Sequence, residues 1–135
     1  MKLVLDTNVW LSGIFWSGEA SKIIKQENIK IVITEEILSE IVTIIGRETK
    51  FQKYLLNLKL SLESLLRTIL SLCILIEPRV KLEVVKADPK DNIILEAALG
   101  GKVDYVISYD HHLLNMIEFR GIKIIHPTEF LKNYS

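Results

Sequence analysis

The chain has 135 residues, which fits one domain spanning residues 1–135, and 49% of them are apolar, with a mean hydropathy of +0.27. No apolar run reaches the roughly 18 residues of a membrane span, and a single cysteine excludes an internal disulfide, so we expect a cytoplasmic protein without a membrane partner. Lysine plus arginine and aspartate plus glutamate each number 17, so the net charge gives no support for nonspecific nucleic-acid binding.

The N-terminal part of the chain alternates strand and helix patterns. KLVLD at residues 2–6 is a continuous apolar run, which is typical of strands buried on both faces of a parallel sheet. A helix is expected over residues 19–28, and KIVI at 30–33 predicts a second strand. Thr34 is suited to cap a helix that runs to about Ile45 and stops at the following glycine.

Residues 50–72 form the longest helical stretch. Its apolar residues step by four and three from Phe51 to Leu72, and further apolar residues lie beside them, so the stripe is wide. A wide stripe favours a packed helix, or a pair of helices, over a free coiled coil. This region is also a candidate groove for a helix of a partner protein.

The C-terminal half continues the alternation, with strands expected at 73–78, 104–108 and 122–125. The helices are expected from DPKDN to Gly100–Gly101, from Asp110 to about Ile117, and after a cap at Thr128. Strands that alternate with helices imply parallel pairing and an α/β fold. In such folds, functional groups gather at the carboxyl edge of the sheet.

Two acids occupy that predicted edge. Asp6 lies at the end of the first strand, and Asp110 lies shortly after the end of the fourth strand. Each carboxylate alone is as well explained by a turn or helix cap. Together they favour a functional interpretation, because parallel strands bring their carboxyl ends to the same edge.

A third candidate acid lies in D-P-K-D at the start of a helix. Asp88 is suited to cap this helix, with Pro89 at its first position. Asp91 shares a helical face with Ile94 and Leu95, so it is expected to point inward, toward the sheet. A buried carboxylate is costly unless a cation or hydrogen-bond donors satisfy it.

The helix at 34–45 offers a fourth acid. Glu36 points away from its apolar stripe, whereas Glu35 and Glu40 flank the stripe on opposite sides, and periodicity alone does not choose between them. Three or four converging carboxylates repel one another unless a cation neutralises them. Ligands that are all oxygen suit Mg²⁺ or Mn²⁺, which can activate water for a displacement at phosphorus.

The segments that carry these acids resemble the four acidic blocks of the PIN domain family. They are VLDTNV, EEILSEI, DPKDNIILEAAL and YVISYDHHLL, and the closing KIIHPTEFL resembles the end of a subgroup of PIN-family toxins. The resemblance implies a three-layer α/β/α sandwich with a central parallel five-stranded sheet. It also implies a Mg²⁺- or Mn²⁺-dependent endoribonuclease, a VapC-like toxin that forms homodimers, cleaves RNA and is blocked by an antitoxin.

The resemblance also assigns roles to individual residues. It selects Glu40 over Glu35 and implies that a metal-activated water is the nucleophile. The implied catalytic residues and metal ligands are Asp6, Glu40, Asp91 and Asp110. Thr7, Asn8 and Ser108 match small polar residues that support these acids.

The chain departs from the family pattern at Tyr109, whose ring is expected either to crowd the site or to stack on a base. The adjacent His111 and His112 are expected to be exposed polar residues, and His126 to be structural. Packing is the preferred interpretation of Trp10 and Trp16. Lys50 and Lys53 lie within a locally basic stretch, which is explained equally well by contact with RNA phosphates and by an ordinary solvated helix face.

Two other interpretations remain. The first is a catalytically silent binding or adaptor protein of the same fold, which retention of all four acids disfavours. The second is a receiver-like module or phosphoaspartyl phosphatase. It is disfavoured because Asp6 stands alone, Asn8 occupies the place of the second phosphatase aspartate, and the third strand ends in Glu77–Pro78.

Overall fold

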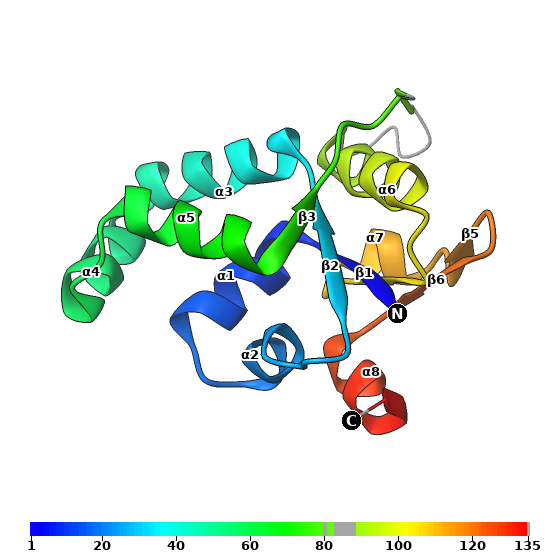
Figure 1. The fold of residues 1–135 in the computed structure, drawn as a ribbon, viewed down its shortest axis with the longest axis horizontal. Helices are drawn as coiled ribbons and strands as arrows, with labels where there is room; N and C mark the ends of the chain where they lie inside the picture. Colours follow the sequence, from blue (N-terminus) through cyan, green and yellow to red (C-terminus); the bar gives the residue numbers. More distant parts are fainter. Residues whose placement is uncertain (80, 83–88, 135) are drawn as a thin grey trace.

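A mostly parallel sheet forms the centre of the molecule (Figure 1). The structure is a computed structural model and describes residues 1–79, 81–82 and 89–134. Within these residues the strand order is β3-β2-β1-β4-β6-β5. The parallel strands are β1 (Lys2–Leu5), β2 (Lys30–Ile33), β3 (Cys73–Leu75), β4 (Tyr105–Ile107) and β6 (Ile122–Ile125). All five predicted strands are therefore confirmed, although β3 is shorter than its apolar run.

The sheet has six described strands, so the expectation of five was wrong by one. The additional strand, β5 (Glu118–Phe119), pairs antiparallel with β6 through a hairpin. Arg120 and Gly121 connect the two strands, with φ angles of 48° and 87°. Positive φ at both turn residues suits a two-residue hairpin. The sequence signal is weak because arginine occupies a position where asparagine or aspartate is usual.

Helices cover both faces of the sheet and complete the three-layer α/β/α sandwich. They are α1 (Thr7–Phe15), α2 (Glu19–Ile24), α3 (Glu35–Arg47), α4 (Thr49–Leu58), α5 (Leu62–Leu72), α6 (Pro89–Gly101), α7 (His111–Leu114) and α8 (Pro127–Tyr134). Helix α6 packs across β1, β2 and β4. Its last residue, Gly101, lies so close to the sheet that an added Cβ would stand 2.7 Å from Val32 Cγ1. Helix α1 was not predicted.

The long helical stretch at 50–72 is two helices rather than one. Lys59 ends α4 in the left-handed conformation, with φ 57°, and the N–H of Leu60 donates to the carbonyl of Leu55. Ser61 then caps α5 by accepting from the N–H of Ser64. Figure 1 shows this α4–α5 hairpin at one end of the molecule. Apolar residues keep their spacing of three or four across the turn between α4 and α5, so the periodicity of the sequence does not reveal where the first helix ends.

Two of the predicted helix caps are within the described residues. Thr34 caps α3 by accepting from the N–H of Ile37, as predicted, although α3 continues past Gly46 to Arg47. Helix α8 begins at Pro127, before the expected cap at Thr128, and His126 Nδ1 accepts from the N–H of Thr128. The predicted cap at Asp88 lies outside the described residues.

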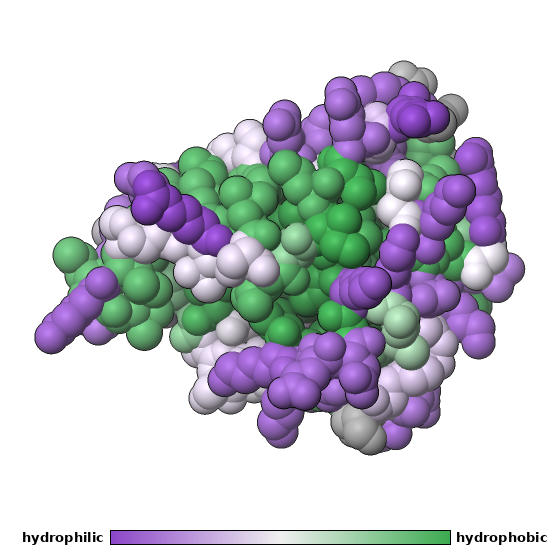
Figure 2. Space-filling view, viewed as in Figure 1, coloured by the Kyte–Doolittle hydropathy of each residue, from purple (hydrophilic) through white to green (hydrophobic). Residues whose placement is uncertain are grey.

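An apolar surface lies over α5 and β3 (Figure 2). Its exposed side chains include Leu70, Leu72, Ile74 and Leu75. β3 is the outermost strand of the sheet, so among the described residues no further strand pairs with its outer edge. No helix in the described ranges has the length and apolar character needed to span a membrane.

The single thiol is expected to be unreactive in the folded protein. Burial raises the pKa of Cys73, at the start of β3, from 9.0 to about 12. Because the thiolate is the reactive form, alkylation at pH 8 should be much slower in the native protein than in urea. Because the pKa is raised in the folded state, the contribution of this thiol to the free energy of unfolding falls as the pH rises from about 9 toward 12. Equal alkylation rates in native and unfolded samples would contradict this assignment.

Candidate functional site

The first acid of the site is held at the end of β1. Strands β1 and β4 are adjacent and parallel, with Leu5 opposite Ile107, so the residues that follow them meet at the carboxyl edge. The N–H of Asp6 donates to the carbonyl of Ile107 at 2.9 Å. Asp6 Oδ1 accepts from the N–H of Thr7 at 2.7 Å, so this carboxylate is also the cap of α1. The cap interpretation and the functional interpretation are therefore compatible.

Ser108 joins the two acids that follow the strands. Its hydroxyl donates to Asp6 Oδ2 at 2.7 Å, and the same Oγ accepts from the N–H of Asp110 at 2.9 Å. Ser108 is fully buried, so its bond to Asp6 is shielded from water, while the bond from Asp110 is partly buried. Asp110 Oδ1 accepts from the N–H of His112 at 2.7 Å and caps α7. The serine thereby sets the position of the first carboxylate relative to the last.

The third acid enters from the first turn of α6. Asp91 is 3% exposed, which confirms the prediction that it points inward. One carboxylate oxygen each from Asp6, Asp91 and Asp110 can be chosen so that the three atoms all lie within 4.8 Å of one another. Three formal negative charges at this separation repel strongly in a partly buried site unless a proton or a cation neutralises them.

The donor set fits a hard divalent cation. All three side chains offer oxygen, and the group contains neither thiolate nor imidazole, which is the chemistry that Mg²⁺ and Mn²⁺ prefer. The residue after Asp6 adds a second sign of an incomplete site. Thr7 Oγ1 is buried and has no hydrogen-bond partner among the described residues. Asp6, Asp91 and Asp110 are the residues that would hold such an ion.

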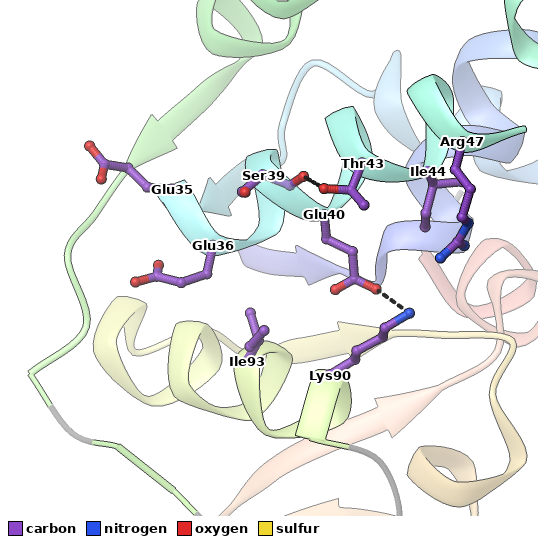
Figure 3. Close-up of a pocket in the computed structure, with 9 residues that line it drawn as sticks. All are labelled: Glu35, Glu36, Ser39, Glu40, Thr43, Ile44, Arg47, Lys90 and Ile93. Carbon is purple, nitrogen blue, oxygen red and sulfur yellow. Dashed lines mark hydrogen bonds and ion pairs between the residues drawn. The ribbon is translucent and has the colours of Figure 1, made fainter.

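Glu40, the fourth predicted ligand, lies beside this cluster without being part of it. Its carboxylate points from α3 toward the start of α6, where Oε1 lies 3.8 Å from Nζ of Lys90 (Figure 3). The Glu40 side chain is only 14% exposed, whereas Glu35 is exposed. The structure therefore brings Glu40, and not Glu35, toward α6, the helix that carries Asp91.

The other predicted supporting residues have different positions. Thr7 contacts Asp6 through its backbone N–H rather than through its hydroxyl. Asn8 is exposed, and no hydrogen bond joins its side chain to another described residue. Tyr109 is half-buried, with its ring edge-on to that of His126 at 5.1 Å. This packing confirms a structural role for His126.

The remaining candidates lie on the surface or in the core. His111 and His112 are exposed, as predicted. Trp10 is 1% exposed and belongs to the core, while Trp16 is 46% exposed and packs against an aromatic cluster. The other members of this cluster are Phe15, Phe51 and Tyr54.

The basic residues predicted to contact RNA lie on α4. Lys50 Nζ lies 3.7 Å from Glu48 Oε1 and 5.2 Å from the centre of the Phe51 ring. Lys53 is exposed on the same helix.

Sequence reasoning missed Lys90. A signal was present in D-P-K-D, because a lysine in the first turn of a helix opposes the helix dipole and therefore invites another explanation. Its acidic partner comes from α3, fifty residues away in the sequence, so local patterns could not identify the pair.

Comparison with known proteins adds two findings. The family model described as "PIN domain" matches residues 2–112. A solved structure, that of VapBC2 from Rickettsia felis bound to a DNA fragment from their promoter, contains a chain of similar fold with a TM-score of 0.65. That chain is 15% identical in sequence, and the match covers 93% of the present chain and 98% of the other. Comparison with curated proteins finds no match.

Proposed function

Because the chain belongs to the PIN domain family, we propose that it is a metal-dependent endoribonuclease that cleaves RNA with a metal-activated water. The observation that carries the proposal is the convergence of three carboxylates from β1, α6 and the end of β4 within 4.8 Å. The test is incubation with structured RNA and Mn²⁺, in which the wild-type protein should cleave and Asp6→Asn should not. A Mg²⁺ or Mn²⁺ ion in the site supplies activation of water and stabilisation of charge at phosphorus.

The chain's own residues prepare this site before substrate binds. Ser108 and the N–H of Thr7 fix both oxygens of Asp6, so that carboxylate has little rotational freedom. The N–H of His112 holds Asp110 in the same way. We propose that Glu40 would help to hold the ion as a fourth ligand, because its side chain already faces α6, the helix that carries Asp91.

The proposed cellular role is that of a VapC-like toxin in the cytoplasm, with an antitoxin protein and a second copy of the chain as partners. The fold shared with a chain of a VapBC2 complex supports the toxin role. The apolar surface over α5 and β3 is a suitable area for a protein partner. A neighbouring reading frame whose small product binds this chain and inhibits cleavage would support the assignment, and its absence would count against it.

One observation favours the catalytically silent alternative, a PIN-fold binding or adaptor protein. Glu40 is paired with Lys90 rather than placed in the carboxylate cluster, so a lysine already neutralises one of the four acids. Calorimetric titration with Mn²⁺ separates the two functions. Binding near neutral pH supports the nuclease, and absence of binding supports the silent protein.

Lys50 and Lys53 are proposed to contact RNA phosphates outside the catalytic site. In the double variant Lys50→Glu/Lys53→Glu, the slope of log affinity against log salt should fall by about 1.4, since each lost contact to single-stranded RNA removes about 0.7. Binding by fluorescence anisotropy at several salt concentrations measures this slope. The matched control is Lys22→Glu/Lys132→Glu, which changes two lysines on α2 and α8. An unchanged slope in the Lys50 and Lys53 variant would rule out the contact.

A further inference from the structure

A cavity of about 460 Å³ lies between the C-terminal part of α6 and the segment that leaves β3. Figure 1 shows these two parts of the chain side by side. They approach so closely that a Cβ added to Gly100 would stand 3.3 Å from Cα of Pro78. The volume is in the range of pockets that hold small molecules, roughly 300–1,000 Å³. The lining residues are Glu77, Arg79, Glu96, Leu99, Gly100 and Lys102.

Glu96 is the unusual residue of this cavity. It is only 6% exposed, yet it makes no hydrogen bond or ion pair with another described residue. Its oxygens are not among the fully enclosed side-chain atoms that lack a partner, so the carboxylate opens into the cavity. A carboxylate withdrawn from water is unfavourable unless a cation or hydrogen-bond donors satisfy it. The burial of this acid therefore indicates a ligand with a cationic group.

The mouth of the cavity carries charges of both signs. Glu77, Arg79 and Lys102 are exposed, and none of them forms an ion pair among the described residues. Since Glu96 is buried and these three are exposed, Glu96 lies at the inner end and the other charges lie at the mouth. The C-terminal end of α6 adds partial negative charge, which also favours a cation. A ligand that is cationic at its inner end and zwitterionic at its outer end matches this distribution.

We propose that this cavity binds a free basic amino acid of the arginine type. Its guanidinium group pairs with Glu96, and its aliphatic carbons lie against Leu99. Its α-carboxylate lies at Arg79 and Lys102, and its α-ammonium lies at Glu77. A guanidinium is favoured over an ammonium because its planar fork of donors can bind a carboxylate through two parallel hydrogen bonds. The site goes beyond the proposed nuclease function, because none of these residues belongs to the carboxylate cluster.

The first test is calorimetric titration of the full chain with L-arginine, L-citrulline and agmatine in EDTA. L-Citrulline has the shape of arginine but a neutral urea group, so it leaves Glu96 unpaired and should bind at least about 30-fold more weakly. Agmatine lacks the α-carboxylate and should bind about threefold more weakly, as expected for loss of an exposed ion pair. Absence of arginine binding, or equal binding of arginine and citrulline, would overturn the proposal.

Glu96→Gln tests the inner end of the cavity. It should lower arginine affinity about 30-fold and remove the preference for arginine over citrulline. Without ligand its melting temperature should be at least that of the wild type, because it removes a buried charge that has no partner. The matched control is Glu129→Gln, on an exposed position of α8, which should bind arginine as the wild type does. Unchanged arginine affinity in Glu96→Gln would rule out this site.

Arg79→Gln/Lys102→Gln tests the mouth, and it keeps the proposal testable if Glu96→Gln does not fold. Both changes are at exposed positions. Arginine affinity should fall to that of agmatine, while agmatine affinity should not decrease. The matched control is Lys22→Gln/Lys132→Gln, on α2 and α8. An undiminished advantage of arginine over agmatine in the Arg79 and Lys102 variant would overturn the placement of the α-carboxylate.

Asp6→Asn separates this cavity from the carboxylate cluster, where a guanidinium could also pair with acids. This variant should bind arginine as tightly as the wild type does, whether or not the chain cleaves RNA. Loss of arginine binding in Asp6→Asn, with binding retained in Glu96→Gln, would place the ligand in the cluster and overturn the proposal. Failure of RNA cleavage with arginine binding intact would contradict the nuclease function alone.

Discussion

Asp6→Asn is expected to abolish Mn²⁺-dependent RNA cleavage while leaving the protein folded. Asp6 contributes one of the three negative charges that lie within 4.8 Å of one another, and both of its oxygens are held by donors. Asparagine keeps the shape of the side chain but carries no charge. Because loss of a residue that only supports a metal ligand costs 10–100-fold, loss of a ligand itself should lower Mn²⁺ affinity by more than about 100-fold.

Thermal unfolding measures the same change without any RNA. At a Mn²⁺ concentration 100 times Kd, the wild-type protein should gain about 2.7 kcal/mol, a rise in melting temperature on the order of 10 °C for a chain of this length. Asp6→Asn should show little or no rise. Its melting temperature in EDTA should be close to that of the wild type, because relief of repulsion offsets the weaker hydrogen bonds.

Asp104→Asn is the matched control. Asp104 is exposed before β4, where Oδ2 accepts from the N–H of Lys2 at 2.9 Å, and it lies at the opposite end of that strand from the carboxylate cluster. This variant should keep both cleavage and the Mn²⁺-dependent rise. Equal cleavage by the wild type and Asp6→Asn would exclude Asp6 as a ligand.

Ser108→Ala is the second variant with a large expected effect. Its hydroxyl donates to Asp6 and accepts from the N–H of Asp110, and the side chain is fully buried. In the alanine variant, the N–H of Asp110 and Oδ2 of Asp6 both lose their hydrogen bond to Ser108. This loss should lower the free energy of unfolding by about 1–3 kcal/mol. Mn²⁺ affinity should fall about 10–100-fold, because Asp6 is no longer oriented.

Calorimetry and urea unfolding measure the two effects separately. Ser21→Ala on α2 is a suitable control, because Ser21 is also buried but lies outside the carboxylate cluster. A merely structural role for Ser108 predicts lower stability with unchanged Mn²⁺ affinity. That result would contradict the positioning role assigned to the serine.

Much of the fold follows from local patterns. The five parallel strands appear as apolar runs. Thr34 caps α3, as expected for a threonine that directly precedes two acids. The missed features are those in which local signals are weak or mixed. Helix α1 starts immediately after a buried strand and is apolar enough to resemble its continuation, and the turn at Arg120 and Gly121 has an unusual first residue.

The candidate site likewise has some residues whose positions local patterns predict and others whose roles they do not. The positions of Asp6 and Asp110 after apolar strands, and of Asp91 on the inward face of a helix, are properties of short segments, and each is readable from spacing. The resemblance to PIN domains, rather than periodicity, selected Glu40. The importance of Ser108 was readable only as a match to the family pattern, since nothing in its neighbourhood indicates two hydrogen bonds.

The sequence by itself determined which side chains reach the carboxyl edge of the sheet, because strand and helix periods are local and directly expressed in residue spacing. Only the tertiary structure decided how those side chains meet. The bond from Ser108 to Asp6 spans 102 residues, and the Glu40–Lys90 pair spans fifty. Such contacts depend on the order and register of strands and on the packing of α3 against α6, which arise from the whole core rather than from any one segment.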